Sequence, residues 1–336
     1  MRAAVIGGGS WGTAFAQVLC DAGQDVVQWA RDPQIVDAIN ARHENPAYHP
    51  GIRLPEQLTA TGDVFAALGG AELVVLGMPT QTVRAALEHW GAAIPANAVV
   101  LSLAKGIEQD TDLRVSEIVQ QVTGIGPERI AVLSGPNLSG EIILREPTAT
   151  TVACSDEATA IEMQRVCTAP YFRPYYTTDV TGVEIAGATK NVIALATGIA
   201  AGMRLGENAQ AALVTRGLAE MTRFGAAVGA NPLTFLGLSG VGDLVATCAS
   251  PLSRNRSFGV HLGEGMTVQQ VIDTTKQTCE AVKSCQPIVE LAESHGVEMP
   301  IAQAVVAVVH HGMPAAELVD RFMSRRTKAD SGAEHH

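Results

Sequence analysis

The first 22 residues combine a short apolar run, a glycine-rich turn and a helical pattern, and this order restricts the possible fold more than any other part of the chain. Residues 3–6 are apolar, and they lead into a Gly-Gly-Gly-Ser-Trp-Gly turn that begins at Gly7 and ends at Gly12. A G-x-G-x-x-G pattern says little in a chain with 33 glycines, but between a strand and a helix it is typical of dinucleotide-binding units. Gly7 would allow the tight turn, Gly9 the approach of a pyrophosphate, and Gly12 close packing of helix and strand. A tight turn without a ligand is the alternative.

More strand-like runs follow, and helical patterns separate them, which predicts a mostly parallel sheet with helices on both faces. From Val183 onward only helical periodicity is found. We therefore predict an α/β fold, with a Rossmann-type doubly wound domain over residues 1–182, an all-α domain over 183–326 and a loose tail over 327–336. The further predicted strands cover 25–29, 73–77, 99–103, 130–133 and 149–153, and the predicted helices cover 80–90, 112–122, 157–167, 183–201, 208–228, 252–262, 267–275, 280–295, 300–310 and 315–323.

The composition limits the class of protein. At 336 residues the chain exceeds what one hydrophobic core normally supports, so two domains are expected. Its net charge of −11 argues against nucleic acid or an anionic membrane surface as partner, so cations that bind an anionic ligand must be placed locally. The six cysteines form no C-x-x-C pair, which indicates neither a disulfide framework nor a zinc ribbon and fits a reducing cytoplasm. We expect no leader segment, and no apolar run of membrane-spanning length, because Gly, Asp, Glu or Arg interrupts every candidate.

The end of the second predicted strand bears on which nicotinamide cofactor binds. A carboxylate at this position typically binds the ribose 2′-OH of NAD, whereas an arginine accommodates the 2′-phosphate of NADP. Arg31 occupies this position, and Asp32 followed by Pro33 is typical of a helix N-cap and first helical residue. We therefore expect NADP, or both cofactors, rather than NAD alone. A solvated surface arginine is the alternative.

Two loops that follow later strands carry polar groups toward the carboxyl edge of the sheet, where ligands of such sheets bind. Lys105 follows the strand at 99–103 and precedes a glycine, which favours a contact with an anion or a carbonyl group. The loop at 134–141 offers backbone N–H groups and small hydroxyls. A solvated loop lysine and an ordinary turn are the alternatives.

Residues 181–196 are mostly small and apolar, and Lys190 is the only cation between Arg173 and Arg204. A helix of such residues packs close to its neighbours, so an ammonium group within it loses water. This loss disfavours the charged form and brings the lysine toward the range useful for proton transfer. Asn191 adds a donor and an acceptor beside it. The alternative is a buried helix whose lysine reaches the surface.

Two polar stretches in the helical half are at odds with simple packing. Asp243 stands at a predicted helix start with Thr247 one turn later, and a helix N-cap is the simpler interpretation of this carboxylate. Ser253, Arg254 and Asn255 would cluster in the first turn of the next helix, where hydroxyl, guanidinium, amide and free N–H groups suit a phosphate. An arginine-rich surface turn is the alternative for this cluster.

Six short blocks carry most of these features, at residues 7–14, 105–106, 134–136, 188–191, 240–244 with 247–248, and 253–256. In order and spacing they resemble the NAD(P)-dependent sn-glycerol-3-phosphate dehydrogenases, and the resemblance extends from residue 1 to about 325. It implies a cytosolic homodimer that interconverts dihydroxyacetone phosphate and sn-glycerol 3-phosphate, which supplies the backbone for phospholipid synthesis.

The resemblance also implies roles for single residues. Lys190 is the expected proton donor and acceptor, and the other expected catalytic residues are Lys105, Asn191 and Asp243. The expected substrate-binding residues are Lys105, Gly135, Asn137, Lys190, Asp243, Ser253, Arg254 and Asn255. The expected cofactor-binding residues are Gly7, Gly9, Ser10, Trp11, Gly12, Arg31, Lys105, Ser139, Arg254 and Glu280. The chain departs from the family pattern at 137–139, where the family has a small hydroxyl, Phe and Ala, and at 278–281, where it has Val-x-Glu-Gly.

These residues predict a mechanism. Hydride passes from the nicotinamide to the ketone carbon, Lys190 donates a proton to the oxygen, and Lys105 or Asn191 stabilises the developing negative charge. Asp243 would orient Lys190, while the 253–255 cluster holds the phosphate and so positions the reacting carbon. No metal is expected, because the cofactor carries the chemistry.

Two other functions remain open at this point. A reductase of another 2-keto or sugar-acid substrate could use the same two-domain architecture, but it would not need the phosphate cluster at 253–255. A non-catalytic nucleotide-binding protein could keep the glycine turn, but it would have no use for Lys105, Lys190 and Asp243 together.

Overall fold

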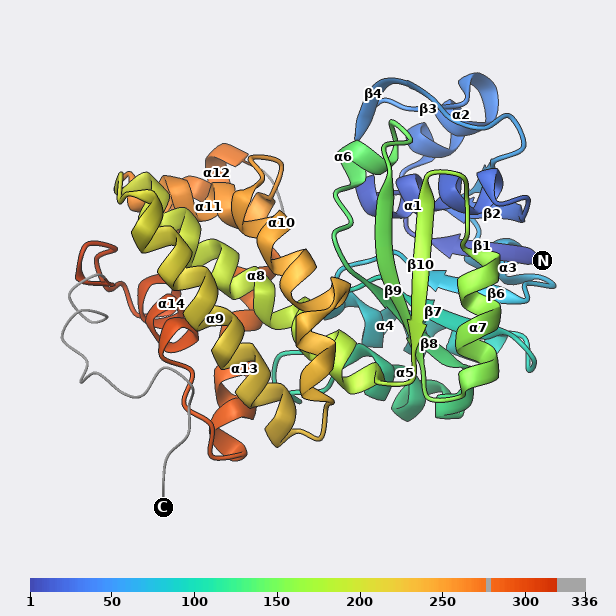
Figure 1. The fold of residues 1–336 in the computed structure, drawn as a ribbon. Coiled ribbons are helices and arrows are strands. Elements are labelled where there is room, and N and C mark those ends of the chain that lie inside the picture. The colour runs from blue at the N-terminus through green and yellow to red at the C-terminus, as the bar shows by residue number, and fades with distance from the viewer. Residues whose placement is uncertain (276–278, 319–336) are drawn as a thin grey trace.

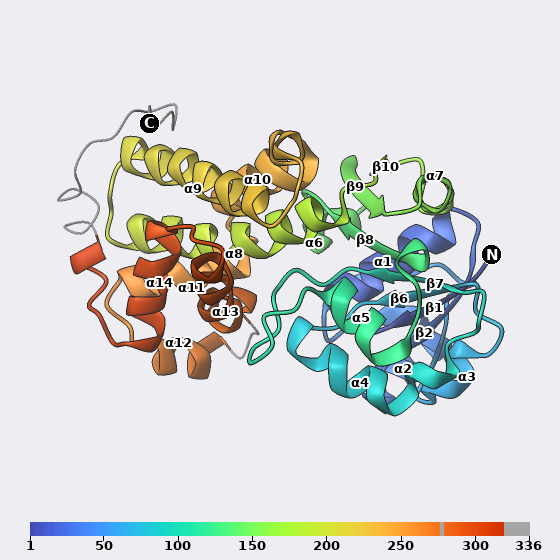
Figure 2. The same cartoon turned by 90° about the horizontal axis from the view of Figure 1, so that it is seen from below.

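The computed structural model describes residues 1–275 and 279–318. It consists of a sheet-containing N-terminal half and a helical C-terminal half that lie side by side, as Figure 1 and the perpendicular view in Figure 2 show. Strand β10 (Phe172–Thr177) is the last strand among the described residues, and the long helix α8 (Val180–Gly202) follows it directly. The predicted α/β fold class is confirmed.

The N-terminal half is built on an eight-stranded sheet with the strand order β10-β9-β8-β7-β6-β1-β2-β5. Its neighbouring strands run parallel, except that β9 is antiparallel to β8. A separate short hairpin, β3–β4, lies beside the N-terminal end of α1 and is antiparallel. The strands are β1 (Arg2–Ile6), β2 (Asp25–Trp29), β3 (Glu44–Asn45), β4 (His49–Arg53), β5 (Thr59–Thr61), β6 (Leu73–Leu76), β7 (Val99–Ser102), β8 (Ile130–Ser134) and β9 (Thr148–Cys154), with β10 as given above.

Helices cover both faces of this sheet. Successive side chains along a strand point to opposite faces, and in this sheet the side chains on both faces are apolar. In β1, Ala3 and Val5 belong to one buried core, together with α1, α2 and α7, whereas Ala4 and Ile6 belong to another, together with α3, α4 and α5. The helices of this half are α1 (Ser10–Asp21), α2 (Pro33–Arg42), α3 (Val64–Leu68), α4 (Val83–Trp90), α5 (Val115–Thr123), α6 (Ser139–Ile142) and α7 (Glu157–Val166).

The C-terminal half packs around α8, whose residues from Gly182 to Ala200 are all buried. The surrounding helices are α9 (Glu207–Ala227), α10 (Asp243–Ala249), α11 (Arg254–Gly263), α12 (Val268–Thr275), α13 (Glu280–Ser294) and α14 (Pro300–His310). Figure 1 shows α8 running from the sheet-containing half through the centre of the helical half. The position of α8 therefore connects the two halves.

The expectation that no apolar run is long enough to span a membrane is wrong for α8. In the part of the chain that the structure describes, this is the one helix that is long and apolar enough by composition, because its glycines do not interrupt it and Glu184 and Lys190 are its only charged residues. However, 89% of its most apolar stretch is buried inside the protein. The helix is accordingly the core of the helical half.

The predicted strands and helices are present, with ends that differ by a few residues. The short strands β3, β4 and β5 were not predicted, and neither was β10. Strand β10 contains Pro174, which argues against a strand from sequence, but β10 is the edge strand of the sheet, where a missing backbone N–H is tolerated. Most of the helix predicted at 315–323, and the whole tail at 327–336, lie outside the described residues.

Candidate active site

Two lysines from different halves of the chain bind the same carboxylate. Lys190 Nζ donates a hydrogen bond of 2.7 Å to Asp243 Oδ1, and Lys105 Nζ donates one of 2.6 Å to Asp243 Oδ2. Lys190 is only 6% exposed and Asp243 only 1%. The lysine of α8 therefore does not reach bulk solvent, and the surface interpretation of Lys190 is wrong.

Secondary structure brings these three side chains together. Lys105 follows the end of β7, Lys190 lies in the third turn of α8, and Asp243 is the first residue of α10. The N-cap of α10 is Gly242, and the Asp243 carboxylate binds the two lysines instead of capping the helix. The N-cap interpretation of Asp243 is thus wrong. Lys105 Nζ also donates to the carbonyl oxygen of Gly135 at 2.9 Å, which connects it to the loop after β8.

The buried charges change the proton affinities of the site. The pKa of Lys105 is lowered to about 8, because burial and the ammonium group of Lys190 lower it more than the Asp243 carboxylate raises it. Burial alone would raise the pKa of Asp243, but the ammonium groups of Lys105 and Lys190 lower it below its ordinary value. Thr247 Oγ1 accepts a second hydrogen bond from Lys190 Nζ at 2.7 Å. With two cations and one anion, the cluster is a local positive centre in an acidic protein.

Two asparagines border this cluster. Asn191 Nδ2 donates to the carbonyl oxygen of Lys105 at 3.2 Å, and Asn255 Nδ2 donates to Asn191 Oδ1 at 2.8 Å. The backbone N–H of Ala281 donates to Asn255 Oδ1 at 3.2 Å. The carbonyl oxygen of Lys105 can only accept a hydrogen bond, and the backbone N–H of Ala281 can only donate one. The side-chain amides of Asn191 and Asn255 between them can therefore be oriented in only one way.

The predicted cluster at 253–255 forms the start of α11, as expected. Ser253 is the N-cap, and its hydroxyl accepts a hydrogen bond from the backbone N–H of Arg256 at 3.3 Å. Arg254 is the first helical residue and is exposed, whereas Ser253 is buried and Asn255 half-buried. A helix N-terminus with a guanidinium, an amide and a hydroxyl can bind a phosphate group.

The glycine turn has the geometry that a pyrophosphate site requires. Gly7 has φ +142°, and a Cβ atom on Gly7 or on Gly12 would lie closer than 3.0 Å to a backbone carbonyl oxygen. A Cβ atom on Gly9, by contrast, would meet no atom of the described residues within 4 Å. Gly9 is the N-cap of α1 and supplies no side-chain cap. Backbone N–H groups at this helix start therefore face a space in which a diphosphate can bind.

Other predicted cofactor residues lie around this turn. Ser10 Oγ and Ser139 Oγ are 2.7 Å apart, which joins α1 to α6. Trp11 packs edge-on against Phe15, and its Nε1 is buried with no hydrogen-bond partner among the described residues. Such an orphaned donor is consistent with a ligand that supplies the missing acceptor.

The end of β2 has the arrangement expected from the sequence. Asp32 caps α2 by accepting a hydrogen bond from the backbone N–H of Gln34 at 2.9 Å, and Pro33 is the first helical residue. Arg31 is exposed beside it. The Asp32 carboxylate thus acts as the helix N-cap that the sequence predicts.

Two more predicted residues have unusual surroundings. Glu280 is the first residue of α13, and burial raises its pKa to about 7, although Arg254 and Lys283 act in the opposite direction. The amide of Asn137 has buried oxygen and nitrogen atoms with no partner within the described chain. Unsatisfied polar groups of this kind fit a ligand-binding loop.

Two residues near the site were not predicted. His49, at the start of β4, is 5% exposed, and its Nε2 lies 2.9 Å from the carbonyl oxygen of Ser10. Nothing in the sequence marks this histidine, since its partner is distant along the chain. Gly187 was also missed, although a side chain there would press on Ser134 Oγ and on the Lys105 side chain. The small residues on either side of Gly187 indicate close helix packing and could have identified it from the sequence.

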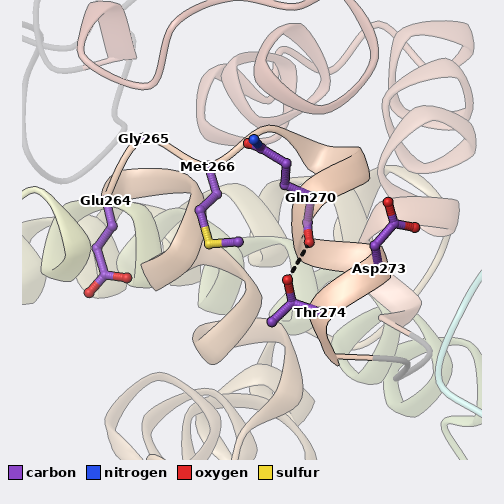
Figure 3. Close-up of a pocket in the computed structure, with 6 residues that line it drawn as sticks. All are labelled: Glu264, Gly265, Met266, Gln270, Asp273 and Thr274. Carbon is purple, nitrogen blue, oxygen red and sulfur yellow. Dashed lines mark hydrogen bonds between the residues drawn. The ribbon is translucent and has the colours of Figure 1, made fainter.

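A separate surface hollow between α11 and α12 is lined by Glu264, Gly265, Met266, Gln270, Asp273 and Thr274 (Figure 3). Its lining residues include two carboxylates and no basic side chain. It lies beyond the C-terminal end of α11, whereas Arg254 begins that helix, and ten helical residues span about 15 Å. This hollow is therefore unsuited to an anionic ligand and does not belong to the lysine site.

A glycine turn on a doubly wound sheet, a helical second half and a lysine pair around a buried carboxylate where the halves meet define a two-domain nicotinamide-dinucleotide dehydrogenase. Comparison with known families agrees with this class. The chain belongs to the NAD-dependent glycerol-3-phosphate dehydrogenase family, since the family model for the N-terminus matches residues 2–160 and the model for the C-terminus matches residues 179–320.

Individual relatives cover nearly the whole chain. The glycerol-3-phosphate dehydrogenase [NAD(P)+] of Thermobifida fusca is 57% identical over 330 residues, which cover 98% of each chain. The protein of the same name from Nocardia farcinica is 54% identical over 335 residues, covering 98% of this chain and 99% of its own.

Solved structures agree with these relatives. The glycerol-3-phosphate dehydrogenase of Coxiella burnetii superposes with a TM-score of 0.91 at 35% identity, covering 96% of this chain and 99% of its own. A PanE/ApbA family ketopantoate reductase from Ralstonia eutropha superposes with a TM-score of 0.59 at 17% identity, covering 95% of this chain and 100% of its own, and so shares the fold alone.

Proposed function

We propose that this chain catalyses the reversible reduction of dihydroxyacetone phosphate to sn-glycerol 3-phosphate with NADH or NADPH, and that Lys190 is its proton donor and acceptor. The observation that carries the proposal is the buried Lys190 ammonium, held by Asp243 and Thr247 next to Lys105. The names of the relatives from Thermobifida and Nocardia support the same reaction. The alternative reductase of a non-phosphorylated keto acid is not favoured, because its structural likeness is confined to the fold.

The cofactor, when bound, supplies or accepts the hydride. As negative charge develops on the substrate oxygen, Lys190 donates a proton to it, and the second cation, Lys105, stabilises that charge. Asp243 binds both amines and so holds them at the same point. In the reverse direction Lys190 takes the proton from the hydroxyl group. Asn191 lies beside the lysines and adds a polar contact for the substrate.

The phosphate of the substrate would bind at the start of α11. Ser253, Arg254 and Asn255 provide hydroxyl, guanidinium and amide groups there, together with free backbone N–H groups. Gly135 and Asn137 would line the substrate on the opposite side, since Lys105 contacts the carbonyl oxygen of Gly135. Binding at the phosphate positions the carbonyl carbon, which lowers the barrier of the chemical step.

The cofactor would bind across the glycine turn. The turn provides backbone N–H groups for the diphosphate, and the use of the Asp32 carboxylate as a helix cap supports a slight preference for NADP, with Arg31 on the 2′-phosphate. Glu280 and Lys105 would lie near the nicotinamide end. The full set of proposed cofactor contacts is Gly7, Gly9, Ser10, Trp11, Gly12, Arg31, Lys105, Ser139, Arg254 and Glu280.

Three broader proposals accompany the reaction. Residues 1–182 would bind the cofactor and residues 183–326 would bind the substrate and form a homodimer. The enzyme would act in the cytoplasm, where it would supply the glycerol phosphate backbone for phospholipid synthesis. These proposals are supported by the sequence resemblance and by the burial of the membrane-length helix α8.

Purified protein should oxidise NADPH or NADH when dihydroxyacetone phosphate is added, and the loss of nicotinamide absorbance measures the rate. A panel of 2-keto acids serves as the comparison, and activity on these alone would refute the proposal. The Lys190→Ala variant should bind the cofactor normally and lose turnover by at least about a hundredfold, as expected for a general acid. Turnover close to that of the unmodified protein would remove Lys190 from its role.

A further inference from the structure

Helices α8 and α11 run parallel, side by side and in a fixed register (Figure 1). Asn191 contacts Asn255 by a hydrogen bond of 2.8 Å. Four residues further along each helix, Leu195 faces Gly259, and four residues beyond that, Ile199 faces Gly263. The Asn191–Asn255 hydrogen bond therefore continues the same line of contacts toward the active site.

Four glycines allow this close contact, and we call them the glycine seam: Gly198 and Gly202 on α8, and Gly259 and Gly263 on α11. A Cβ atom on any of them would lie closer than 3.0 Å to a backbone carbonyl oxygen of the other helix, an approach that real Cβ atoms essentially never show. In each helix the two glycines are four residues apart, so they lie on one face. No side chain separates the two backbones along the seam.

We propose that the glycine seam is a positioning device that sets the distance between the phosphate-binding residues Arg254 and Asn255 and the proton-transfer residue Lys190. This inference rests on the function proposed above. None of the four glycines would touch the substrate. They act through the start of α11, which carries Arg254 and Asn255 and lies in register with the turn of α8 that carries Lys190 and Asn191.

The two ends of the substrate site depend on different contacts. Lys190 is held by Asp243 and Thr247 of α10, and Asp243 in turn is held by Lys105 of the other half. Helix α11 takes no part in these hydrogen bonds. A change in the distance between α8 and α11 would thus move the phosphate end of the site and leave the proton-transfer end in place.

The Gly259→Ala variant tests this inference. Its methyl group would push α11 away from the Leu195 carbonyl oxygen by on the order of 1 Å, and a misplacement of that size can cost about a hundredfold in rate. We expect kcat/KM for dihydroxyacetone phosphate to fall about a hundredfold, while kcat/KM for dihydroxyacetone, which lacks the phosphate, changes by less than about threefold. Cofactor affinity, measured by quenching of protein fluorescence, should change far less than kcat/KM for dihydroxyacetone phosphate, because Arg254 is the one proposed cofactor contact on α11.

The Gly217→Ala variant is the matched control. Gly217 lies on α9 and also packs against α8, but a Cβ atom there would meet the side chain of Ile193 rather than backbone, so the strain would fall between α8 and α9 and not on α11. This variant should keep the ratio of the two activities. If Gly259→Ala fails to fold, Gly202→Ala at the last residue of α8 replaces it, with an expected loss of about tenfold for the phosphorylated substrate alone.

Equal losses for the two substrates, or no loss for either, would overturn the positioning role of the seam. A different result would bear on the reaction itself. If the unmodified protein reduced dihydroxyacetone but gained nothing from the phosphate group, the proposed function would fail, whatever the glycine variants showed.

Discussion

The carboxylate of Glu184, in the second turn of α8, accepts a hydrogen bond of 2.8 Å from the backbone N–H of Ser116 at the start of α5. The Ser116 hydroxyl and the Arg114 guanidinium also donate to this carboxylate, at 2.6 Å and 2.8 Å. Glu184 thus caps a helix of the other half, and it lies on the helix that carries Lys190. These contacts fix the start of α8 to the sheet-containing half.

Replacement of Glu184 should therefore destabilise the protein. The Glu184→Gln variant leaves Arg114 with Glu117 as its remaining carboxylate partner and removes the charge from three hydrogen bonds, so we expect a cost of about 2 kcal/mol. Urea unfolding followed by circular dichroism measures the change. The control is Glu56→Gln, because Glu56 pairs with Arg53 on the surface and its loss should cost less than about 0.5 kcal/mol. Similar costs for the two variants would contradict the anchoring role of Glu184.

The shared carboxylate of Asp243 should be essential for turnover. In Asp243→Asn, the two lysines lose the anion that raises the pKa of Lys105, so that pKa should fall further below about 8. We expect kcat to drop by about a hundredfold or more, since the proton donor loses its fixed orientation. The pH dependence of the residual kcat should also shift toward lower pH. An unchanged pH profile would show that Asp243 does not control the lysine pair.

Glu280 should make the stability of the cofactor-free protein fall with rising pH. Its pKa is raised from 4.5 to about 7 in the folded protein, so between these values the folded state holds a proton that the unfolded state has lost. The stability contribution is therefore present below pH 4.5 and is lost as the pH rises through about 7, with a difference of at most about 3 kcal/mol.

The Glu280→Gln variant provides the comparison for this effect, because glutamine does not titrate. Urea unfolding at pH 5 and pH 7.5 should show a smaller loss of stability with pH for this variant than for the unmodified protein. Parallel changes in the two proteins would assign the pH dependence to other groups. The His49 imidazole, whose pKa burial lowers, titrates in both proteins and so cancels from the difference.

Gly9 should be required for cofactor binding and not for folding. A methyl group on Gly9 meets no atom of the described protein, but it would occupy the space in which the diphosphate approaches the backbone. Gly9→Ala should weaken cofactor binding by about tenfold or more, measured by fluorescence titration, with an unchanged melting temperature.

Gly206→Ala is the matched control for this prediction, because Gly206 is also a helix N-cap with open space around its Cα atom. It should bind the cofactor normally. Equal affinities of the Gly9 and Gly206 variants would place the diphosphate elsewhere.

Local signals made several of these features predictable. The glycine turn, the Asp32 N-cap and the start of α11 each depend on residues within a few positions of one another, and each was found at its predicted place. The small residues of α8 also indicated burial of Lys190 correctly. Such features follow from the intrinsic backbone preferences of glycine, proline and capping residues.

Features that depend on distant partners were harder to predict. Asp243 has the local pattern of an N-cap, but its two lysine partners come from residues 53 and 138 positions earlier in the chain. The same reason explains why His49 was missed, since its contact with Ser10 joins a hairpin to α1. The four-residue spacing of the glycines in the seam can be read from the sequence of each helix. However, nothing in the sequence indicates that the two helices are parallel neighbours.

The burial of α8 has a consequence for synthesis of the chain. Most of its cover comes from α9, α10, α11, α13 and α14, all of which leave the ribosome later. Until then a helix with the length and composition of a membrane span is presented to the translation machinery without its packing partners. Chains truncated soon after Gly202 should accordingly be captured by chaperones or degraded, so that premature termination yields no stable cofactor-binding fragment.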